Sequence, residues 1–118
     1  MTEHSHPVVF NKQHALARVG GLEDVLRDVM TLMTTESPKV HAEISASFQR
    51  GDLVGLKRSA HTLKGSVGLV GATDLVRRLR RIEDSASLGD TVDLPAEFIE
   101  IDRQFAELQQ ILHTELAT

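Results

Sequence analysis

The sequence has no cysteine, no tryptophan and no tyrosine, and its aromatic residues are four phenylalanines among 118 residues. Without cysteine, a disulfide, a thiolate metal site and a cysteine nucleophile are all excluded. A sheet-rich domain would usually contain more aromatic and β-branched residues, whereas the abundant Leu, Ala, Glu and Arg favour helices. The length suits one domain with one hydrophobic core.

Long apolar runs and an excess of positive charge are also missing. No run approaches the roughly 18–20 apolar residues that span a bilayer, and residues 1–7 lack the basic and apolar regions of a signal peptide. The formal net charge is −4, whereas domains that bind nucleic acids are usually basic. We therefore expect a cytoplasmic protein that binds neither membrane nor nucleic acid.

The beginning of the chain predicts a disordered lead-in over residues 1–9, followed by a short helix within residues 10–18. Glu3 and His6 in the lead-in have the spacing of an E-x-x-H metal motif, but no helical pattern supports a metal site there. In the short helix Asn11 is the expected N-cap. The pair Gly20-Gly21 is expected to end that helix.

A long helical pattern runs from about Leu22 to Arg50 and contains Pro38. Its expected core stripe is Leu22, Leu26, Val29, Met33, Val40, Ile44 and Phe48. A proline inside a helix removes a hydrogen bond and usually bends the helix, so the pattern allows one bent helix or two helices that divide near Ser37. We favour one bent helix because the stripe keeps its phase across the proline.

The next pattern begins after Asp52, an expected N-cap, and runs to about Val70, with Gly71 as the left-handed terminating residue. The apolar positions of this segment form one stripe: Leu56, Ala60, Leu63, Val67 and Val70. At about 100° per residue, His61 lies roughly 140° from the centre of that stripe. The histidine is therefore expected to face outward.

The residues near His61 on this helix have the character of a phosphate-accepting site. Lys57, Lys64, Gly65 and Gly68 all fall within about 60° of the histidine. Glycine in a helix costs roughly 1 kcal/mol relative to alanine, so glycines here require a reason, and small residues let another molecule approach the ring closely. Lysines would favour an anion bound to the ring.

Two more helices complete the pattern. The first turns Leu75, Leu79, Ile82 and Ala86 inward. Its polar face carries four arginines, which suit either a solvated face or a docking surface for an acidic partner: Arg77, Arg78, Arg80 and Arg81. After a loop over residues 87–93, Pro95 suits the first turn of a last helix. The inward stripe of the last helix is Phe98, Ile101, Phe105, Leu108 and Leu112.

Four long amphipathic helices joined by short turns predict an all-α fold, an up-down-up-down antiparallel four-helix bundle over residues 10–118. The short N-terminal helix would close one end of the bundle.

The stretch H-T-L-K-G-S-V-G-L-V-G-A-T-D-L, from His61 to Leu75, resembles the signature of histidine-containing phosphotransfer (HPt) domains. The matching residues are His61, Leu63, Lys64, Gly65, Ser66, Gly71, Ala72 and Leu75. Glu83 lies where the family commonly ends its next helix with an acidic residue. By these motifs the resemblance covers about Phe10 to Ser87, and the last helix is similar only in architecture.

The resemblance implies a phosphorelay carrier of a two-component regulatory system rather than an enzyme. His61 would accept a phosphoryl group and carry it between aspartates of receiver domains, Lys64 would stabilise the phosphate, and Gly65 would give clearance to the receiver. Its partners would be response-regulator receiver domains and a hybrid histidine kinase. We expect a monomer with no ATP site and no cofactor, and Mg²⁺ on the partner receiver.

Further residues near His61 are candidates for receiver binding. Val54 and Leu69 are apolar residues on or beside the outward face, which suggests a docking patch. Lys57 and Arg58 would add positive charge, and Ser66 and Gly68 suit either the interface or close packing. His14 and His41 are expected at the surface or in packing contacts, and His113, near a helix C-terminus, would favour the helix dipole.

Two other classes of function compete with the carrier. A non-catalytic helical adaptor would bind receivers without phosphotransfer, and such a protein would commonly have replaced His61. A metal or cofactor bundle would turn Glu or E-x-x-H pairs inward, whereas the inward stripes here are apolar. A histidine kinase would need a nucleotide-binding domain, for which 118 residues leave no room.

Overall fold

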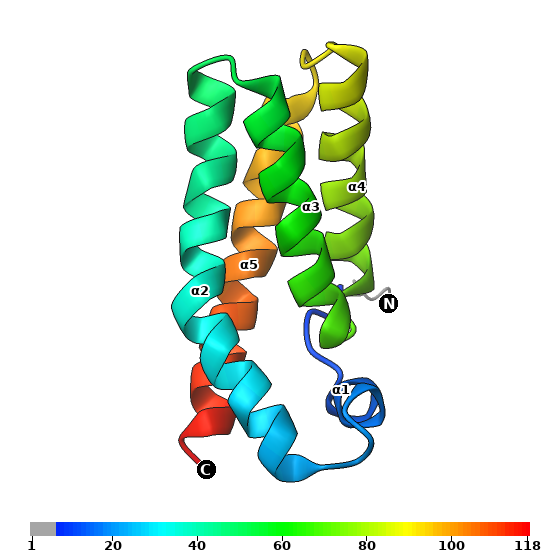
Figure 1. Ribbon diagram of the computed structural model, residues 1–118, viewed down its shortest axis with the longest axis vertical. Coiled ribbons are helices and arrows are strands. Elements are labelled where there is room, and N and C mark those ends of the chain that lie inside the picture. The colour runs from blue at the N-terminus through cyan, green and yellow to red at the C-terminus, as the bar shows by residue number, and fades with distance from the viewer. Residues whose placement is uncertain (1–6) are drawn as a thin grey trace, which may run out of the picture.

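The computed structural model describes residues 7–118, which form five helices and no strand (Figure 1). In chain order the helices are α1 (Lys12–Arg18), α2 (Glu23–Gln49), α3 (Leu53–Leu69), α4 (Thr73–Leu88) and α5 (Leu94–Leu116). The long helices run alternately up and down (Figure 1). Helices α2 and α4 each pack against both α3 and α5. The predicted all-α bundle is confirmed.

The short helix α1 packs against α2 and α3, as expected, at the end of the bundle where α3 stops (Figure 1). Asn11 is the predicted N-cap, and its side-chain oxygen accepts a hydrogen bond from the backbone N–H of His14 at 3.0 Å. The backbone N–H of Asn11 donates to the carbonyl of Val70 at 2.7 Å. Residues 1–6, with the Glu3–His6 motif, lie outside the described residues. Val9, the last residue of the predicted lead-in, is buried in the core.

Helix α2 is one helix through Pro38, as predicted, and it is visibly bent (Figure 1). Leu22 was predicted to face the core, and this prediction was wrong. Leu22 lies one residue before the start of the helix and is 58% exposed. The buried residues follow a spacing of four and three: Leu26, Met30, Met33, Ser37, Ile44 and Ser47. This heptad-like spacing keeps one seam of the helix against its neighbours, and the predicted stripe missed it at Met30, Ser37 and Ser47.

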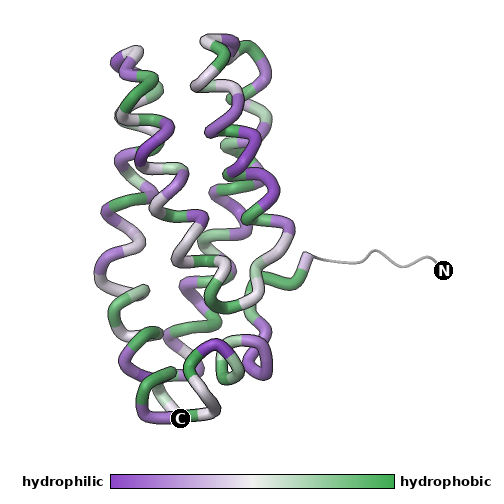
Figure 2. The backbone as a smooth tube through the Cα atoms, turned by 45° about the vertical axis from the view of Figure 1, so that its right-hand side comes forward, coloured by the Kyte–Doolittle hydropathy of each residue, from purple (hydrophilic) through white to green (hydrophobic). Residues whose placement is uncertain are grey.

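The core stripes of α3 and α4 are buried as predicted, and the four residues from Ile101 to Leu112 on the stripe of α5 are buried too. Phe98 is half-buried and meets Phe48 of α2 edge-to-face, with ring centroids 4.9 Å apart. Hydrophobic and hydrophilic residues alternate along each long helix (Figure 2). This amphipathic pattern is what a bundle requires. None of the helices within residues 7–118 is long and apolar enough to cross a membrane.

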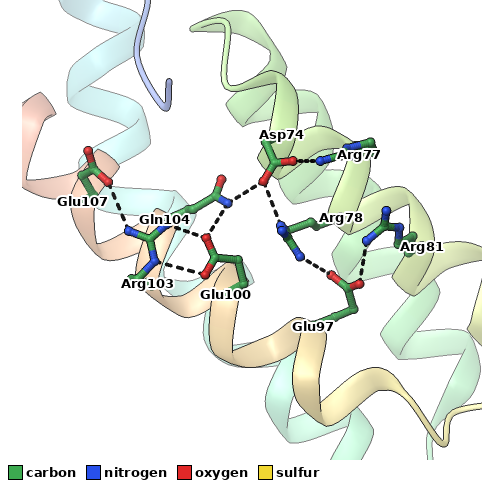
Figure 3. Close-up of polar contacts among 9 residues, drawn as sticks. All are labelled: Asp74, Arg77, Arg78, Arg81, Glu97, Glu100, Arg103, Gln104 and Glu107. Atoms are coloured by element: carbon green, nitrogen blue, oxygen red, sulfur yellow. Dashed lines mark hydrogen bonds and ion pairs between the residues drawn. The ribbon is translucent and has the colours of Figure 1, made fainter. Parts of the chain in front are cut away.

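The seam between α4 and α5 contains an ion-pair network (Figure 3). Arg78 donates to Asp74 at 2.8 Å and to Glu97 at 3.0 Å, and Arg81 donates to Glu97 at 2.8 Å. Arg77 also pairs with Asp74. Three of the four arginines of α4 therefore form ion pairs within the domain. These three match neither alternative that the sequence allowed, a purely solvated face or a free docking surface.

Candidate functional site

His61 projects from the outer face of α3. The helix starts at Asp52, whose side chain accepts a hydrogen bond from the backbone N–H of Gly55 at 2.8 Å. The core stripe, with Ala60 and Leu63 fully buried, fixes the rotation of the helix. The His61 side chain is 70% exposed. The outward orientation that was predicted from helical geometry is confirmed.

Glu83 of α4 joins His61 to Lys64. Its Oε2 atom lies 2.8 Å from Nδ1 of His61, and its Oε1 atom lies 2.6 Å from Nζ of Lys64. The side chains of Glu83 and Lys64 are only 11% and 19% exposed. One buried carboxylate therefore holds a nearly buried ammonium group and an exposed imidazole.

The contact with Glu83 fixes which nitrogen of His61 can react. A carboxylate only accepts hydrogen bonds, so the proton of this bond must belong to Nδ1. In a neutral imidazole with the proton on Nδ1, the lone pair is on Nε2. The exposed nitrogen of His61 is then a nucleophile.

The environment of Glu83 keeps its carboxylate ionised. Burial raises the pKa of Glu83, but the contacts with Lys64 and then with His61 outweigh burial and hold this pKa below its ordinary value of 4.5. The carboxylate is therefore negatively charged at neutral pH, which is the state needed to accept the Nδ1 proton of His61 and to pair with Lys64.

A hollow of about 530 Å³ lies beside His61, and its lining includes three predicted partner-binding residues. The lining residues are Val54, Lys57, Arg58, His61, Thr62 and Glu83. Val54 is 70% exposed, as its predicted outward position requires. The hollow therefore combines apolar surface and positive charge next to the exposed nitrogen.

The other predicted residues lie apart from that hollow. Ser66 and Leu69 line a groove between α2 and α3 with Leu32 and Met33. Gly68 packs closely against α4, since a Cβ atom there would lie 3.6 Å from Cγ2 of Val76. The structure thus divides the predicted docking residues into a group around His61, the pair Ser66 and Leu69 beside α2, and Gly68, which faces α4.

Gly65 lies one turn after His61 and faces open space. A Cβ atom at this position would have no atom within 4 Å apart from its immediate helical surroundings. No intramolecular contact therefore requires glycine here. This openness agrees with the interpretation that the residue leaves room for another molecule.

The contacts of Glu83 were not predicted, although the sequence held a signal. Glu83 lies four residues after Leu79 and three before Ala86, which places a carboxylate beside the inward stripe of α4. Acidic residues are almost never fully buried unless they are paired. Its position therefore required a cationic partner on a neighbouring helix.

Within residues 7–118, His14 and His41 take part in packing or surface contacts, in agreement with expectation. His41 stacks on Phe105 with ring centroids 4.4 Å apart, and its Nε2 lies 2.8 Å from Oδ1 of Asp102. Nε2 of His14 lies 3.2 Å from the carbonyl oxygen of Gly68. His113 is exposed in the last turn of α5.

Comparisons with known proteins give one match to the sequence and one to the fold. A family model described as Hpt domain matches residues 28–115. The fold is similar to the crystal structure of histidine-containing phosphotransfer protein B (HptB) from Pseudomonas aeruginosa PAO1, with a TM-score of 0.83 and 23% sequence identity. This match covers 92% of the present chain and 95% of the other. A search of curated proteins found no significant match.

Proposed function

Because this chain belongs to the Hpt domain family, we propose that His61 carries a phosphoryl group between aspartates of receiver domains in a two-component phosphorelay. Hpt proteins are phosphocarriers of phosphorelay signalling rather than kinases. The observation that carries the proposal for this chain is the hydrogen bond from Nδ1 of His61 to Glu83, because it leaves Nε2 exposed with its lone pair.

Transfer to His61 needs no further nucleophile. The lone pair of Nε2 attacks the phosphorus of an aspartyl phosphate, the N–P bond forms, and the P–O bond to the aspartate breaks. The aspartate leaves as a carboxylate, and the imidazole ring gains positive charge while its proton stays on Nδ1. Return to the next aspartate is the reverse of this step. Phosphoryl transfer depends mainly on positioning and charge stabilisation.

Glu83 and Lys64 supply that positioning and charge. The Glu83 carboxylate stabilises the positive charge that develops on the imidazole, since it lies 2.8 Å from Nδ1. Lys64 is one turn from His61, and its ammonium group, now paired with Glu83, is close enough to offset charge on the incoming phosphoryl group. Gly65 gives the donor room beside the ring.

The partners follow from this role. A hybrid histidine kinase supplies the phosphoryl group through its receiver, and a response-regulator receiver accepts it. Mg²⁺ belongs to the partner receiver, and this chain needs no cofactor and no ATP site of its own. We expect the protein to act as a monomer, because each copy carries the complete cluster of His61, Lys64 and Glu83.

The test is transfer of radiolabelled phosphate from purified phosphorylated receiver domains to the wild-type protein and to His61→Gln. The carrier proposal expects acid-labile label on the wild type and none on the variant. Incubation with ATP alone should label neither protein. An adaptor would bind a receiver without accepting label, so binding without transfer would contradict the proposal.

A further inference from the structure

The four arginines of α4 differ in whether their charge is already used inside the domain. Arg77, Arg78 and Arg81 form ion pairs with carboxylates of α4 and α5 (Figure 3). Arg80 is exposed, and no carboxylate within residues 7–118 lies within ion-pair distance of it. Its positive charge is available to another molecule.

The helical register places Arg80 at the edge of α4 that faces α3. It lies four residues after Val76 and three before Glu83, so the three side chains share one stripe. Glu83 contacts His61 and Lys64 of α3, and Val76 packs against the backbone of α3. Arg80, between these two contacts, therefore projects beside α3 and away from the α5 network.

The level of Arg80 along the bundle is that of Gly65. Helices α3 and α4 are antiparallel (Figure 1), with Val76 opposite Gly68 and Glu83 opposite His61. A residue between Val76 and Glu83 is then opposite the middle of the stretch from His61 to Gly68. The backbone of Arg80 therefore lies level with Lys64 and Gly65 of α3.

Positive charge also lies on the other side of His61. Lys57 and Arg58 line the hollow beside the histidine, and both are exposed. Neither forms an ion pair within the described part of the chain. Unpaired cations thus flank His61 from both helices, although the net charge of the whole chain is −4. Such local charge favours an anionic partner surface.

We propose that Arg80 is a docking residue for the receiver domain and binds an acidic side chain on the receiver surface that covers Gly65. This inference rests on the proposed function, since it needs a receiver that approaches His61. An exposed charge at the rim of an interface acts mainly on the association rate and on the choice of partner. Arg80 therefore acts before the chemical step and does not touch the transferring phosphoryl group.

The experiment compares Arg80→Gln with Arg81→Gln, which removes the same charge from the next residue but on the side that faces Glu97. Each variant and the wild type receive phosphate from two donors: a phosphorylated receiver domain that reacts with the wild type, and the small molecule phosphoramidate. With phosphoramidate the P–N bond of the donor breaks, the N–P bond to His61 forms and ammonia leaves. This donor has no protein surface to dock.

Arg80→Gln should accept phosphate from the receiver about five- to tenfold more slowly than wild type at low salt. The difference should shrink at about 0.5 M salt, because exposed charges are then screened. With phosphoramidate Arg80→Gln should match the wild type, and Arg81→Gln should match it with both donors.

The possible failures are distinguishable. If the wild type accepts phosphate from neither donor, the proposed function is wrong and the docking role of Arg80 is wrong with it. If Arg80→Gln equals the wild type with the receiver, the docking role alone is overturned. If Arg80→Gln is slow with both donors, the arginine acts on the histidine chemistry, which also overturns docking.

Discussion

Helix α4 carries a carboxylate–cation cluster on each of its two flanks, and the two clusters differ in their cations. Toward α5, Asp74 and Glu97 are bound by arginines, which stay protonated and donate in a fixed planar fork. Toward α3, Glu83 is bound by His61 and Lys64. A histidine can hold one hydrogen bond and still present a lone pair, which an arginine never does.

Exposure separates the two flanks further. The side chain of Arg78, at the centre of the α5 cluster, is 24% exposed, whereas that of His61 is 70% exposed. The contacts of Arg78 at the centre of the α5 cluster are therefore largely covered, whereas the α3 cluster ends in an exposed imidazole. The same type of contact holds two helices together on one flank and, in the function we propose, leaves a reactive nitrogen exposed on the other.

The largest expected effect comes from His61→Gln, which removes the nucleophile. Phosphate acceptance from a receiver should be abolished, while the free energy of unfolding should fall by no more than about 1 kcal/mol, because the side chain is mostly exposed and loses one hydrogen bond to Glu83. Transfer assays and urea unfolding measure the two quantities. Label on the variant would mean that another residue is the acceptor.

A bulky side chain at Gly65 should have the next largest effect. Gly65→Phe is expected to slow transfer from a receiver about a hundredfold, because displacement of reacting atoms by about 1 Å can cost that much. Gly65→Ala should instead stabilise the helix by roughly 1 kcal/mol, since the added methyl group meets open space. Unchanged transfer by Gly65→Phe would remove the argument for clearance.

Much of this site follows from the sequence because its determinants are local. The caps at Asn11 and Asp52 and the left-handed Gly71 are set by residues within one turn, and the exposure of His61 follows from 100° per residue. The contact between His61 and Glu83 joins residues 22 positions apart on two helices. This contact depends on the axial register between α3 and α4, which no local sequence pattern determines.

Two errors in the core have different origins. Leu22 continues the apolar pattern, but α2 begins one residue later and Leu22 is left exposed. Gln104 was not expected inside, yet it is fully buried because Asp74 and Glu100 accept hydrogen bonds from its amide. Burial of a polar group depends on a partner from another turn or helix, and hydropathy alone does not reveal it.

Substitution of one carboxylate on each flank of α4 directly tests the difference between the two clusters. Glu83→Gln should slow transfer about tenfold, because a hydrogen bond to a charged group is worth about 1.5–3 kcal/mol and each 1.4 kcal/mol is tenfold in rate. Glu97→Gln should leave transfer unchanged and lower the free energy of unfolding by about 1–2 kcal/mol. If both variants affected only stability, the two flanks would be equivalent.

Lys64→Ala should have a smaller effect on transfer, about fivefold, since one of several charges near the phosphoryl group is lost. The phosphohistidine should also decay faster in this variant. Single-turnover transfer and the decay of acid-labile label provide the measurements, and Lys39→Ala, at an exposed lysine of α2 that pairs with Glu36, serves as the control. If neither rate changes, Lys64 serves only to pair with Glu83.

The smallest effect is expected from pH. Arg103, then Gln104, lower the pKa of Glu100 to about 2 in the folded protein, from an ordinary value of 4.5. Because the folded-state pKa is the lower one, the stabilisation is fully present above pH 4.5 and is lost as pH falls toward 2. Thermal unfolding from pH 6 to pH 2 should show this loss, and Glu100→Gln should make the decline less steep. If the stability of the variant declined equally steeply, other carboxylates would be the cause of the loss at low pH.

The central claim is that Glu83 holds Nδ1 of His61 and leaves Nε2 to react. The most direct test is ¹⁵N and ³¹P NMR of the histidine-labelled protein before and after phosphorylation by a receiver. We expect the Nδ1–H tautomer of His61 before transfer and a phosphoryl group on its Nε2 atom afterwards. Phosphate on Nδ1 of His61, or on any other residue, would contradict it.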